Sequence, residues 1–285
     1  MQLVTVIYNG VEQGCITTSS GNVLIATVNH AEQADWPVGV FELLATGQFD
    51  ELKRWYNEGG RDKLELLETV QPSEARTAPL YRHPRKIWGI GMNYVKTAEE
   101  LTDVAADADP VSFMKPDTTL IGGGDAIVLP VQSERVTAEA ELAIIIGHTC
   151  KNITEAEAPD FVAGFAVSND VTAADIHAKH QRYLTRAKSF DTFFSFGSQM
   201  ITTDEIEDVH QLQVETWQNG ELKHRNSVSN MIFKPWYLVA YHSQVMTLLP
   251  GDVILSGTPG SVIIRSGDVV ECRIDGFTSL VNSVI

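Results

Sequence analysis

Cysteine is scarce in this sequence. Its 285 residues include three cysteines, Cys15, Cys150 and Cys272, which lie far apart and form no CxxC pair. The eight histidines do not cluster with the spacing of metal ligands either. The sequence therefore predicts neither a disulfide framework nor a zinc site.

Long hydrophobic runs are also missing. No apolar run approaches the roughly 20 residues that a membrane-spanning helix needs. The opening residues Met1-Gln2-Leu3 form no basic leader segment. Hydrophobic residues make up 44% and charged residues 20% of the chain, as in ordinary globular proteins. We therefore expect a cytoplasmic protein without a membrane partner.

Basic residues are outnumbered. The chain has 21 lysines and arginines against 37 aspartates and glutamates, a formal net charge of −16. Such a surface repels nucleic acid, which is not expected as a partner. It also repels small anionic substrates, so an acid substrate would require positive charge concentrated within the site.

Several common catalytic and nucleotide-binding motifs are absent. The glycine-rich IGGGD at 121–125 lacks both the GK[ST] of a P-loop and the GxGxxG of a dinucleotide fold, and is interpreted as a turn. No HExxH motif occurs, and Ser198 lies in no GxSxG elbow. These absences disfavour dehydrogenases, zinc proteases and serine hydrolases.

The first third of the chain predicts a small α/β unit. Alternating apolar residues and turn residues indicate strands at 3–8, 11–17 and 23–28, and helical spacing follows over 39–58. A polar, proline-containing stretch then reads as a linker. We predict an N-terminal domain over 1–75, a linker over 76–85 and a catalytic domain over 86–285.

The remainder predicts short strands with few helices. A hairpin is expected at Asn219-Gly220, and helices are expected after Thr154, after Thr172 and over 235–248. The strand candidates lie at 86–91, 126–130, 142–147, 162–168, 212–217 and 253–257. This pattern predicts a mixed α+β fold and not a doubly wound sheet.

Three carboxylates lie at the ends of buried strands. Glu139 and Glu141 precede the apolar run 142–146, and Asp170 ends another apolar strand. Side chains two apart in a strand point the same way, so the glutamates would repel each other unless a cation lay between them. Alternatively, the glutamates face solvent and Asp170 is only a turn or capping residue. Together the three predict an oxygen-ligand site for Mg²⁺ or Mn²⁺.

Basic and hydroxyl residues could complete this site. Lys188 and Arg186 lie in RAKSFDTF, and Lys115 lies in SFMKPD. Each lysine could instead extend along the surface with its ammonium in water. Thr258, in the GDVILSGTPG turn, could bind an anion or merely specify a tight turn.

Taken in order, seven segments resemble the fumarylacetoacetate hydrolase family. They are GMNY (91–94), FMKP (113–116), EAELAIIIG (139–147), VAGFAVSND (162–170), AKSFDTF (187–193), NG (219–220) and LLPGDVILSGTPG (248–260).

The resemblance implies a mixed β-roll catalytic domain, a small N-terminal domain and a homodimer. It also implies a Mg²⁺ or Mn²⁺ site at Glu139, Glu141 and Asp170. Lys188 would serve as the basic residue of the substrate site, and Thr258 would bind the substrate carboxylate. The substrate-binding residues are completed by Lys115, Arg186 and Tyr94.

The chain departs from the family at two places. Many members that cleave C–C bonds carry NYxxHxxE; here Glu100 occupies the acidic position, but Thr97 replaces the histidine. A threonine cannot act alone as a base near neutral pH. Further on, Ala174 stands where arginine is usual, and His177 where glutamine is common. His177 is a candidate replacement base, or alternatively a histidine of the helix surface.

We therefore expect a metal-dependent enzyme acting on a small anionic 2-oxo or 1,3-dioxo acid through a metal-stabilised enolate. The expected reaction is cleavage of a C–C bond by hydrolysis or decarboxylation, and isomerisation or dehydration is the alternative. A degenerate member that binds metal without turnover is the remaining alternative.

Overall fold

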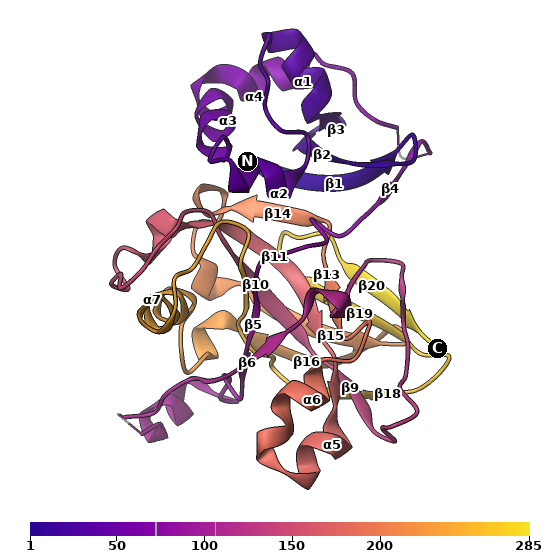
Figure 1. The fold of residues 1–285 in the computed structure, drawn as a ribbon, viewed down its shortest axis with the longest axis vertical. Helices are drawn as coiled ribbons and strands as arrows, with labels where there is room; N and C mark the ends of the chain where they lie inside the picture. The colour runs from indigo at the N-terminus through magenta and orange to yellow at the C-terminus, as the bar shows by residue number, and fades with distance from the viewer. Residues whose placement is uncertain (72, 106) are drawn as a thin grey trace.

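The computed structural model describes residues 1–71, 73–105 and 107–285. It has the predicted mixed α+β fold, in which sheet predominates (Figure 1). The N-terminal elements are β1 (Gln2–Tyr8), β2 (Val11–Thr18), β3 (Gly21–Leu24), α1 (Ile25–Glu32), α2 (Val40–Ala45), α3 (Phe49–Trp55), η1 (Tyr56–Gly60), α4 (Arg61–Leu64) and β4 (Ala75–Thr77).

The third predicted strand, 23–28, is partly wrong. The strand ends at Leu24 and helix α1 begins at Ile25. Ile25 and Val28, three residues apart, are both buried, while Ala26 between them is exposed. This is the spacing of one helical turn, and tertiary packing of that face outweighs the preference of β-branched residues for strands.

A large sheet runs through the whole molecule. Its path is β3-β2-β1-β14-β11-β10-β17-β5-β6, and β4, β7 and β13 pair at its sides. The strands beyond the N-terminal unit are β5 (Ile87–Gly91), β6 (Val111–Lys115), β7 (Leu120–Gly122), β10 (Ala140–Ile146), β11 (Val162–Asp170), β13 (Phe194–Phe196), β14 (Gln199–Thr202) and β17 (Val253–Leu255).

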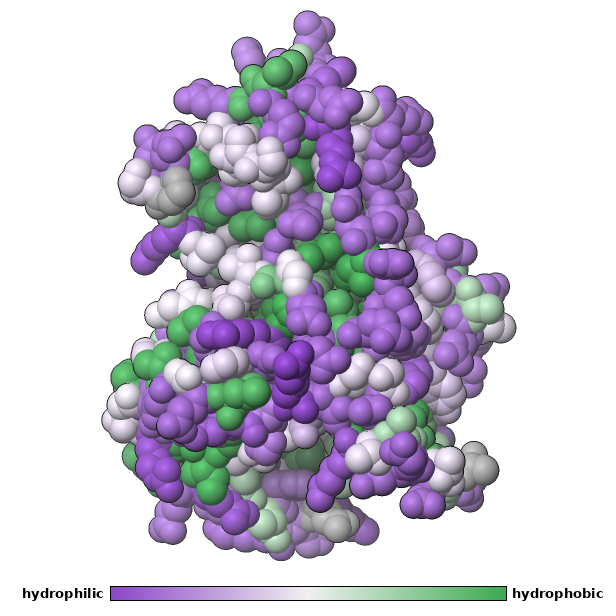
Figure 2. Space-filling model, turned by 180° about the vertical axis from the view of Figure 1, so that it is seen from behind, coloured by the Kyte–Doolittle hydropathy of each residue, from purple (hydrophilic) through white to green (hydrophobic). Residues whose placement is uncertain are grey.

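The sheet continues across the expected linker. Strand β1 pairs antiparallel with β14, with Leu3 opposite Met200, so the N-terminal strands extend the sheet of the second region. One hydrophobic cluster likewise holds Leu3 together with Ile145 and Phe196. Seen from behind, apolar residues are exposed at the waist and again over the lower left of a mainly hydrophilic face (Figure 2). The two regions therefore share a sheet and a core, and the division at 76–85 stays a prediction.

We expect the substitution Leu3→Ala to weaken both regions at once. Leu3 is fully buried in the shared cluster. Removing a buried leucine side chain costs about 2–5 kcal/mol. Urea unfolding followed by tryptophan fluorescence should show a single transition with a lower midpoint. The substitution Val11→Ala, at an exposed position, should leave the midpoint unchanged. Separate transitions of the two regions would contradict the shared core.

Two smaller sheets complete the β structure. One has the order β12-β9-β18 and the other β16-β15-β19-β20-β8. The β15–β16 hairpin turns at Asn219 and Gly220, whose φ angles of 53° and 79° suit a type I′ turn. The strands are β8 (Ala126–Ile127), β9 (Val136–Ala138), β12 (Thr172–Ala173), β15 (Gln213–Gln218), β16 (Glu221–Ser227), β18 (Val262–Ile264), β19 (Val269–Ile274) and β20 (Leu280–Val284).

Helices lie around the outside of the β structure (Figure 1). Helix α7 (Pro235–Val245) begins at the predicted proline. Within the described ranges, no helix is long and apolar enough to cross a membrane. The remaining helices are η2 (Ala98–Asp103), η3 (Asp117–Thr119), η4 (Ala158–Phe161), α5 (Ala174–Lys179), η5 (Gln181–Tyr183), α6 (Leu184–Lys188), η6 (Thr203–Glu205), η7 (Val209–Gln211) and η8 (Val228–Asn230).

Candidate active site

The three predicted carboxylates converge. Strands β10 and β11 are antiparallel neighbours with Ala140 opposite Asn169. This register places the start of β10 beside the end of β11, and the backbone N–H of Asp170 donates to the carbonyl of Glu139 at 2.9 Å. Ligand atoms of Glu139, Glu141 and Asp170 all lie within 4.8 Å of one another. The interpretation of these residues as separate solvent-facing groups is therefore wrong.

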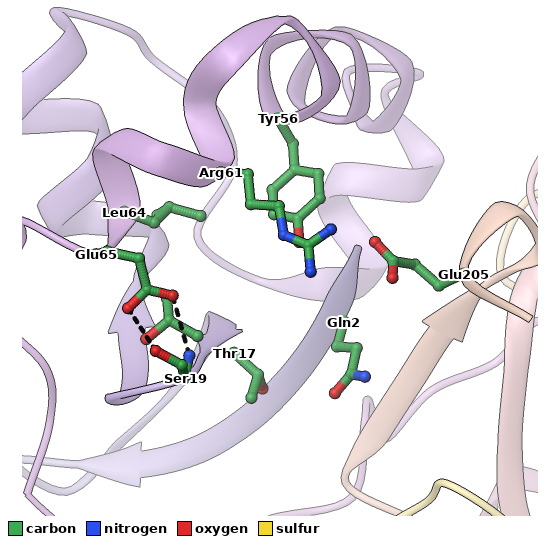
Figure 3. Close-up of a pocket in the computed structure, with 9 residues that line it drawn as sticks. Gln2, Thr17, Ser19, Tyr56, Arg61, Leu64, Glu65 and Glu205 are labelled. Atoms are coloured by element: carbon green, nitrogen blue, oxygen red, sulfur yellow. Dashed lines mark hydrogen bonds between the residues drawn. The ribbon is translucent and has the colours of Figure 1, made fainter.

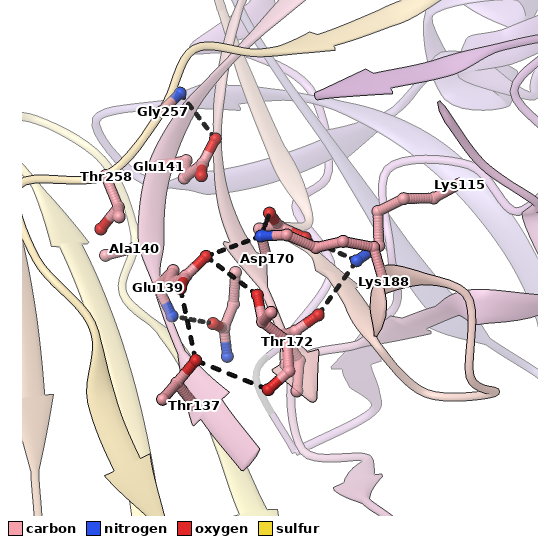
Figure 4. Close-up of polar contacts among 12 residues, drawn as sticks. Lys115, Thr137, Glu139, Ala140, Glu141, Asp170, Thr172, Lys188, Gly257 and Thr258 are labelled. Carbon is pink, nitrogen blue, oxygen red and sulfur yellow. Dashed lines mark hydrogen bonds and ion pairs between the residues drawn. The ribbon is translucent and has the colours of Figure 1, made fainter. Parts of the chain in front are cut away.

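Two buried lysines hold Asp170 (Figure 4). Lys115, the last residue of β6, donates to Asp170 Oδ1 at 2.5 Å. Lys188, the last residue of α6, pairs with Asp170 Oδ2 and donates to Glu139 Oε2 at 2.8 Å. Both lysines are buried, so neither is the surface lysine that the sequence left as an alternative.

Burial and charge determine the protonation of this group. Burial lowers the pKa of Lys115 to about 8. Burial opposes ionisation of Asp170, but the charges of Lys115 and Lys188 outweigh it and lower the pKa of this carboxyl. Burial also acts to lower the pKa of Lys188, but the carboxylates of Asp170 and Glu139 outweigh it and raise that pKa. Lys188 is thus held as an ammonium group between two carboxylates.

Glu139 is oriented by neighbouring polar groups. Thr172 donates its hydroxyl to Glu139 Oε2 at 3.1 Å, and Thr137 donates to Oε1 at 3.3 Å. The side chain of Asn169 accepts a hydrogen bond from the backbone N–H of Glu139 at 2.9 Å. These contacts fix both the backbone and the carboxylate of Glu139.

Glu141 is a buried carboxylate beside other negative charges. Its Oε2 accepts a hydrogen bond from the backbone N–H of Gly257 at 2.7 Å. Burial first, and then the charge of Asp170, raises its pKa well above the usual value. The ionised form of Glu141 therefore calls for additional positive charge nearby.

The donor set fits a hard divalent cation. Three carboxylates face two lysine ammonium groups, and the ion pairs of these lysines go to Asp170 and Glu139, so that an ionised Glu141 would have no ion-pair partner among them. Mg²⁺ and Mn²⁺ prefer carboxylate oxygen ligands. The acidic cluster could hold such an ion.

Thr258 and Tyr94 lie on loops beside the cluster. Thr258 follows Gly257 directly, and its hydroxyl donates to the carbonyl of Gly260 at 3.0 Å. The Tyr94 hydroxyl is buried and has no hydrogen-bond partner among the described residues. Burial first, and then the charge of Glu141, raises the pKa of Tyr94. A buried hydroxyl without a partner costs free energy, and a hydrogen bond to it would remove that cost.

Three other predicted residues lie apart from the cluster. Glu100, His177 and Arg186 share no hydrogen bond or ion pair with it in the part of the chain that the structure describes. Glu100 is exposed and accepts from the backbone N–H of Lys96 at 2.9 Å. Arg186 is exposed and lies 5.9 Å from the ring centroid of Tyr183. Their proposed roles stay predictions.

A separate hollow lies between the N-terminal unit and Glu205 of η6 (Figure 3). Its volume is about 260 Å³, and its walls include Tyr56, Arg61 and Glu65. Both carboxylate oxygens of Glu65 are occupied by Ser19, whose backbone N–H and hydroxyl donate at 3.1 and 2.9 Å. This hollow is distinct from the carboxylate cluster.

Sequence reasoning missed the groups that orient Glu139. The sequence predicts a helix after Thr172, but Thr172 itself belongs to β12, and its hydroxyl contacts Glu139. No local pattern reveals that these residues orient Glu139, because Glu139 lies 30 residues from Asn169 and 33 from Thr172 in the sequence.

Comparison with known proteins settles the family. Residues 86–285 match the family described as Fumarylacetoacetate (FAA) hydrolase C-terminal. This chain belongs to the fumarylacetoacetate hydrolase family. The oxaloacetate tautomerase Fahd2a of Rattus norvegicus mitochondria is 35% identical over 216 residues, covering 73% of this chain and 68% of that protein.

Fumarylacetoacetate hydrolase family structures also share the whole fold. The 5-carboxymethyl-2-hydroxymuconate delta-isomerase of Mycobacterium smegmatis has a TM-score of 0.78 and 28% identity, covering 100% of this chain and 98% of its own. Maleylpyruvate hydrolase of Sphingobium sp. SYK-6, solved with manganese(II) and pyruvate, has a TM-score of 0.81 and 26% identity, with coverages of 100% and 99%. Members of this family thus include tautomerases, isomerases and hydrolases of small oxo acids.

Proposed function

We propose that this protein is a Mg²⁺- or Mn²⁺-dependent enzyme that moves a proton between carbon and oxygen in a small 2-oxo acid. Keto–enol tautomerisation is the simplest such reaction, and isomerisation of a conjugated double bond uses the same enolate. The observation that carries the proposal is the convergence of Glu139, Glu141 and Asp170 beside the ammonium group of Lys188.

Glu139, Glu141 and Asp170 would hold the divalent ion. When bound, the ion supplies Lewis acidity toward the carboxylate and 2-oxo oxygens of the substrate. Lys188 would bind the substrate anion and supply the positive charge that the acidic chain otherwise lacks. In tautomerisation the C3 proton passes to solvent and the 2-oxo oxygen takes up one proton, so that no water is consumed. The Lys188 Nζ and the Tyr94 hydroxyl are the candidate groups for holding the proton at that oxygen.

We propose proton transfer, and not C–C hydrolysis, as the first candidate reaction. The sequence alone favours C–C cleavage. Hydrolysis needs a group that activates water, and Thr97 replaces the family histidine. Thr97 and Glu100 are both exposed. The named activity of the rat relative, oxaloacetate tautomerase, supports the same order. The maleylpyruvate hydrolase, with its bound manganese and pyruvate, supports hydrolysis as the second candidate.

The test is enolisation measured directly. Purified protein with Mg²⁺ or Mn²⁺ should accelerate the equilibration of enol and keto oxaloacetate, followed by the ultraviolet absorbance of the enol. It should also accelerate exchange of C3 hydrogens in deuterated water, followed by NMR. Chelation with EDTA should abolish both effects. Release of pyruvate from acylpyruvates without C3 exchange would instead support the hydrolase, and metal binding without either activity would support a degenerate member.

We expect Thr172→Val to weaken binding of the metal while leaving the fold intact. The valine has nearly the shape of threonine but cannot donate to Glu139 Oε2. Loss of a group that orients a metal ligand typically costs about 10- to 100-fold in affinity or activity. Titration calorimetry with Mn²⁺ measures the change. The matched control is Thr46→Val, which removes a hydroxyl bonded to the Glu42 carbonyl in α2; equal affinities of the two variants would refute the orienting role.

A further inference from the structure

The chain contains two Asn-Gly dipeptides, and both form hairpin turns of the same shape. Asn9-Gly10 joins β1 to β2, and Asn219-Gly220 joins β15 to β16. The φ angles are 51° and 79° in the first turn and 53° and 79° in the second. Both dipeptides are exposed, and apart from adjacent residues no described atom lies within 4 Å of the position that a Cβ atom would take on either glycine. The two turns therefore match in backbone conformation and in access to solvent.

The side chain of Asn219 is held at the start of β19. Its amide Nδ2 donates to Asp268 Oδ1 at 2.8 Å, and its Oδ1 accepts from the backbone N–H of Val269 at 2.9 Å. The hydrogen bond from Asn219 is the largest of the effects that lower the pKa of Asp268, so the acceptor is an ionised carboxylate at neutral pH. A charged acceptor makes this hydrogen bond stronger than one between neutral groups.

The side chain of Asn9 has no such anchor. In the part of the chain that the structure describes, no hydrogen bond includes its amide group, and the residue is exposed. Rotation about the Cα–Cβ bond of an asparagine brings its Cγ atom toward the backbone nitrogen of the next residue. A glycine at that position has no side chain to hinder the approach. The rotation breaks no hydrogen bond at Asn9, whereas at Asn219 it breaks two.

We propose that Asn9 is a site of spontaneous deamidation and that the hydrogen bonds to Asp268 and Val269 protect Asn219 from the same reaction. The backbone nitrogen of Gly10 gives up its proton to solvent and forms a bond to Asn9 Cγ. The bond from Cγ to Nδ2 breaks, and the nitrogen leaves as ammonia after taking up a proton, which leaves a cyclic imide. Water then opens the imide at either carbonyl and gives aspartate or isoaspartate. The net reaction consumes water, releases ammonia and requires no oxidant or cofactor.

Either product changes the turn between β1 and β2. Both products add negative charge to a chain whose net charge is −16. Isoaspartate also adds a carbon atom to the main chain within a two-residue turn, and the register of a hairpin depends on the length of its loop. Because β1 also pairs with β14, the modification acts on the strand that joins the two regions of the molecule.

The test follows both asparagines in the same sample. Purified full-length protein is incubated in mildly alkaline buffer made with oxygen-18 water, which labels the products formed during the incubation, and its peptides are analysed by mass spectrometry. In the folded protein we expect Asn9 to be deamidated about 10- to 100-fold faster than Asn219, the range for a hydrogen bond to a charged group. In protein unfolded by urea the two rates should agree within a few-fold, because the protecting hydrogen bonds are lost.

The variant Asp268→Ala tests the protection directly. It removes the charged acceptor and should raise the rate at Asn219, while the rate at Asn9 in the same sample serves as the control. Asp268 also accepts from the backbone N–H of Arg265 at 2.7 Å, so circular dichroism is used to check that the variant is folded. An unchanged rate at Asn219 in the folded variant would refute the protection.

The wild-type comparison does not depend on the folding of any variant. Equal rates at the two sites in the folded protein, or no deamidation of Asn9, would overturn the proposal. A difference that persists in urea would also overturn it, because flanking residues and not the fold would then set the rates.

Discussion

The variant Lys188→Met is expected to lose nearly all activity and to keep its metal. The Lys188 ammonium lies between Glu139 and Asp170 and 4.7 Å from the ring centroid of Phe113. Methionine fills a similar volume but can neither bind the substrate anion nor hold a proton. Positioned acid–base groups contribute about 10²- to 10⁴-fold, and we expect kcat for enolisation to fall by an amount in that range.

Metal affinity distinguishes a catalytic loss from a structural one. In Lys188→Met, two carboxylates lose a competing cation, so Mn²⁺ affinity measured by calorimetry should stay equal or rise. The control variant is Lys179→Met, at an exposed position on α5. A kcat within a few-fold of wild type would exclude Lys188 from the chemistry, and a parallel loss of metal affinity would assign it to the metal site alone.

The variant Asp170→Asn is expected to lose both metal binding and stability. Asp170 is a candidate ligand, and it also neutralises two buried lysines. Removing one partner of a buried ion pair typically costs about 3–5 kcal/mol, because the remaining charge is left buried. The metal-free variant should therefore unfold at clearly lower urea concentration than the metal-free wild type.

A double-mutant cycle with Lys115→Met isolates this effect. If Lys115 is stabilised by Asp170, the double variant should be less destabilised than the sum of the single variants. Additive losses would show that the 2.5 Å contact between Lys115 and Asp170 contributes little. Lys53→Met, which removes an ion pair with partly exposed Asp204, should change stability by no more than about 1 kcal/mol.

The acidic centre could be predicted because its signals are local. Apolar runs indicated the strands of Glu141 and Asp170, and side-chain alternation placed Glu139 beside Glu141. The structure brings ligand atoms of the three carboxylates within 4.8 Å of one another, and their role as metal ligands stays a prediction. The sequence also indicates Lys115 and Lys188 as candidate site residues, because basic residues are scarce in this acidic chain. The structure pairs both of them with Asp170.

The remaining features depend on long-range pairing. The sequence does not reveal that Thr172 and Asn169 orient Glu139, because turn and cap preferences explain such residues equally well. The homodimer expected from the family is likewise a property of surfaces that no local pattern specifies, and size-exclusion chromatography can test it.

The pairing of β1 with β14 has a practical consequence for any attempt to isolate the C-terminal region. Strand β14 lies next to β11, whose last residue is Asp170. A polypeptide restricted to residues 86–285 would present the β14 edge unpaired, and open strand edges recruit other chains. Such a fragment should self-associate along the strand adjacent to the one that supplies a candidate metal ligand. By pairing with β14, strand β1 covers this edge and prevents it from pairing with another chain.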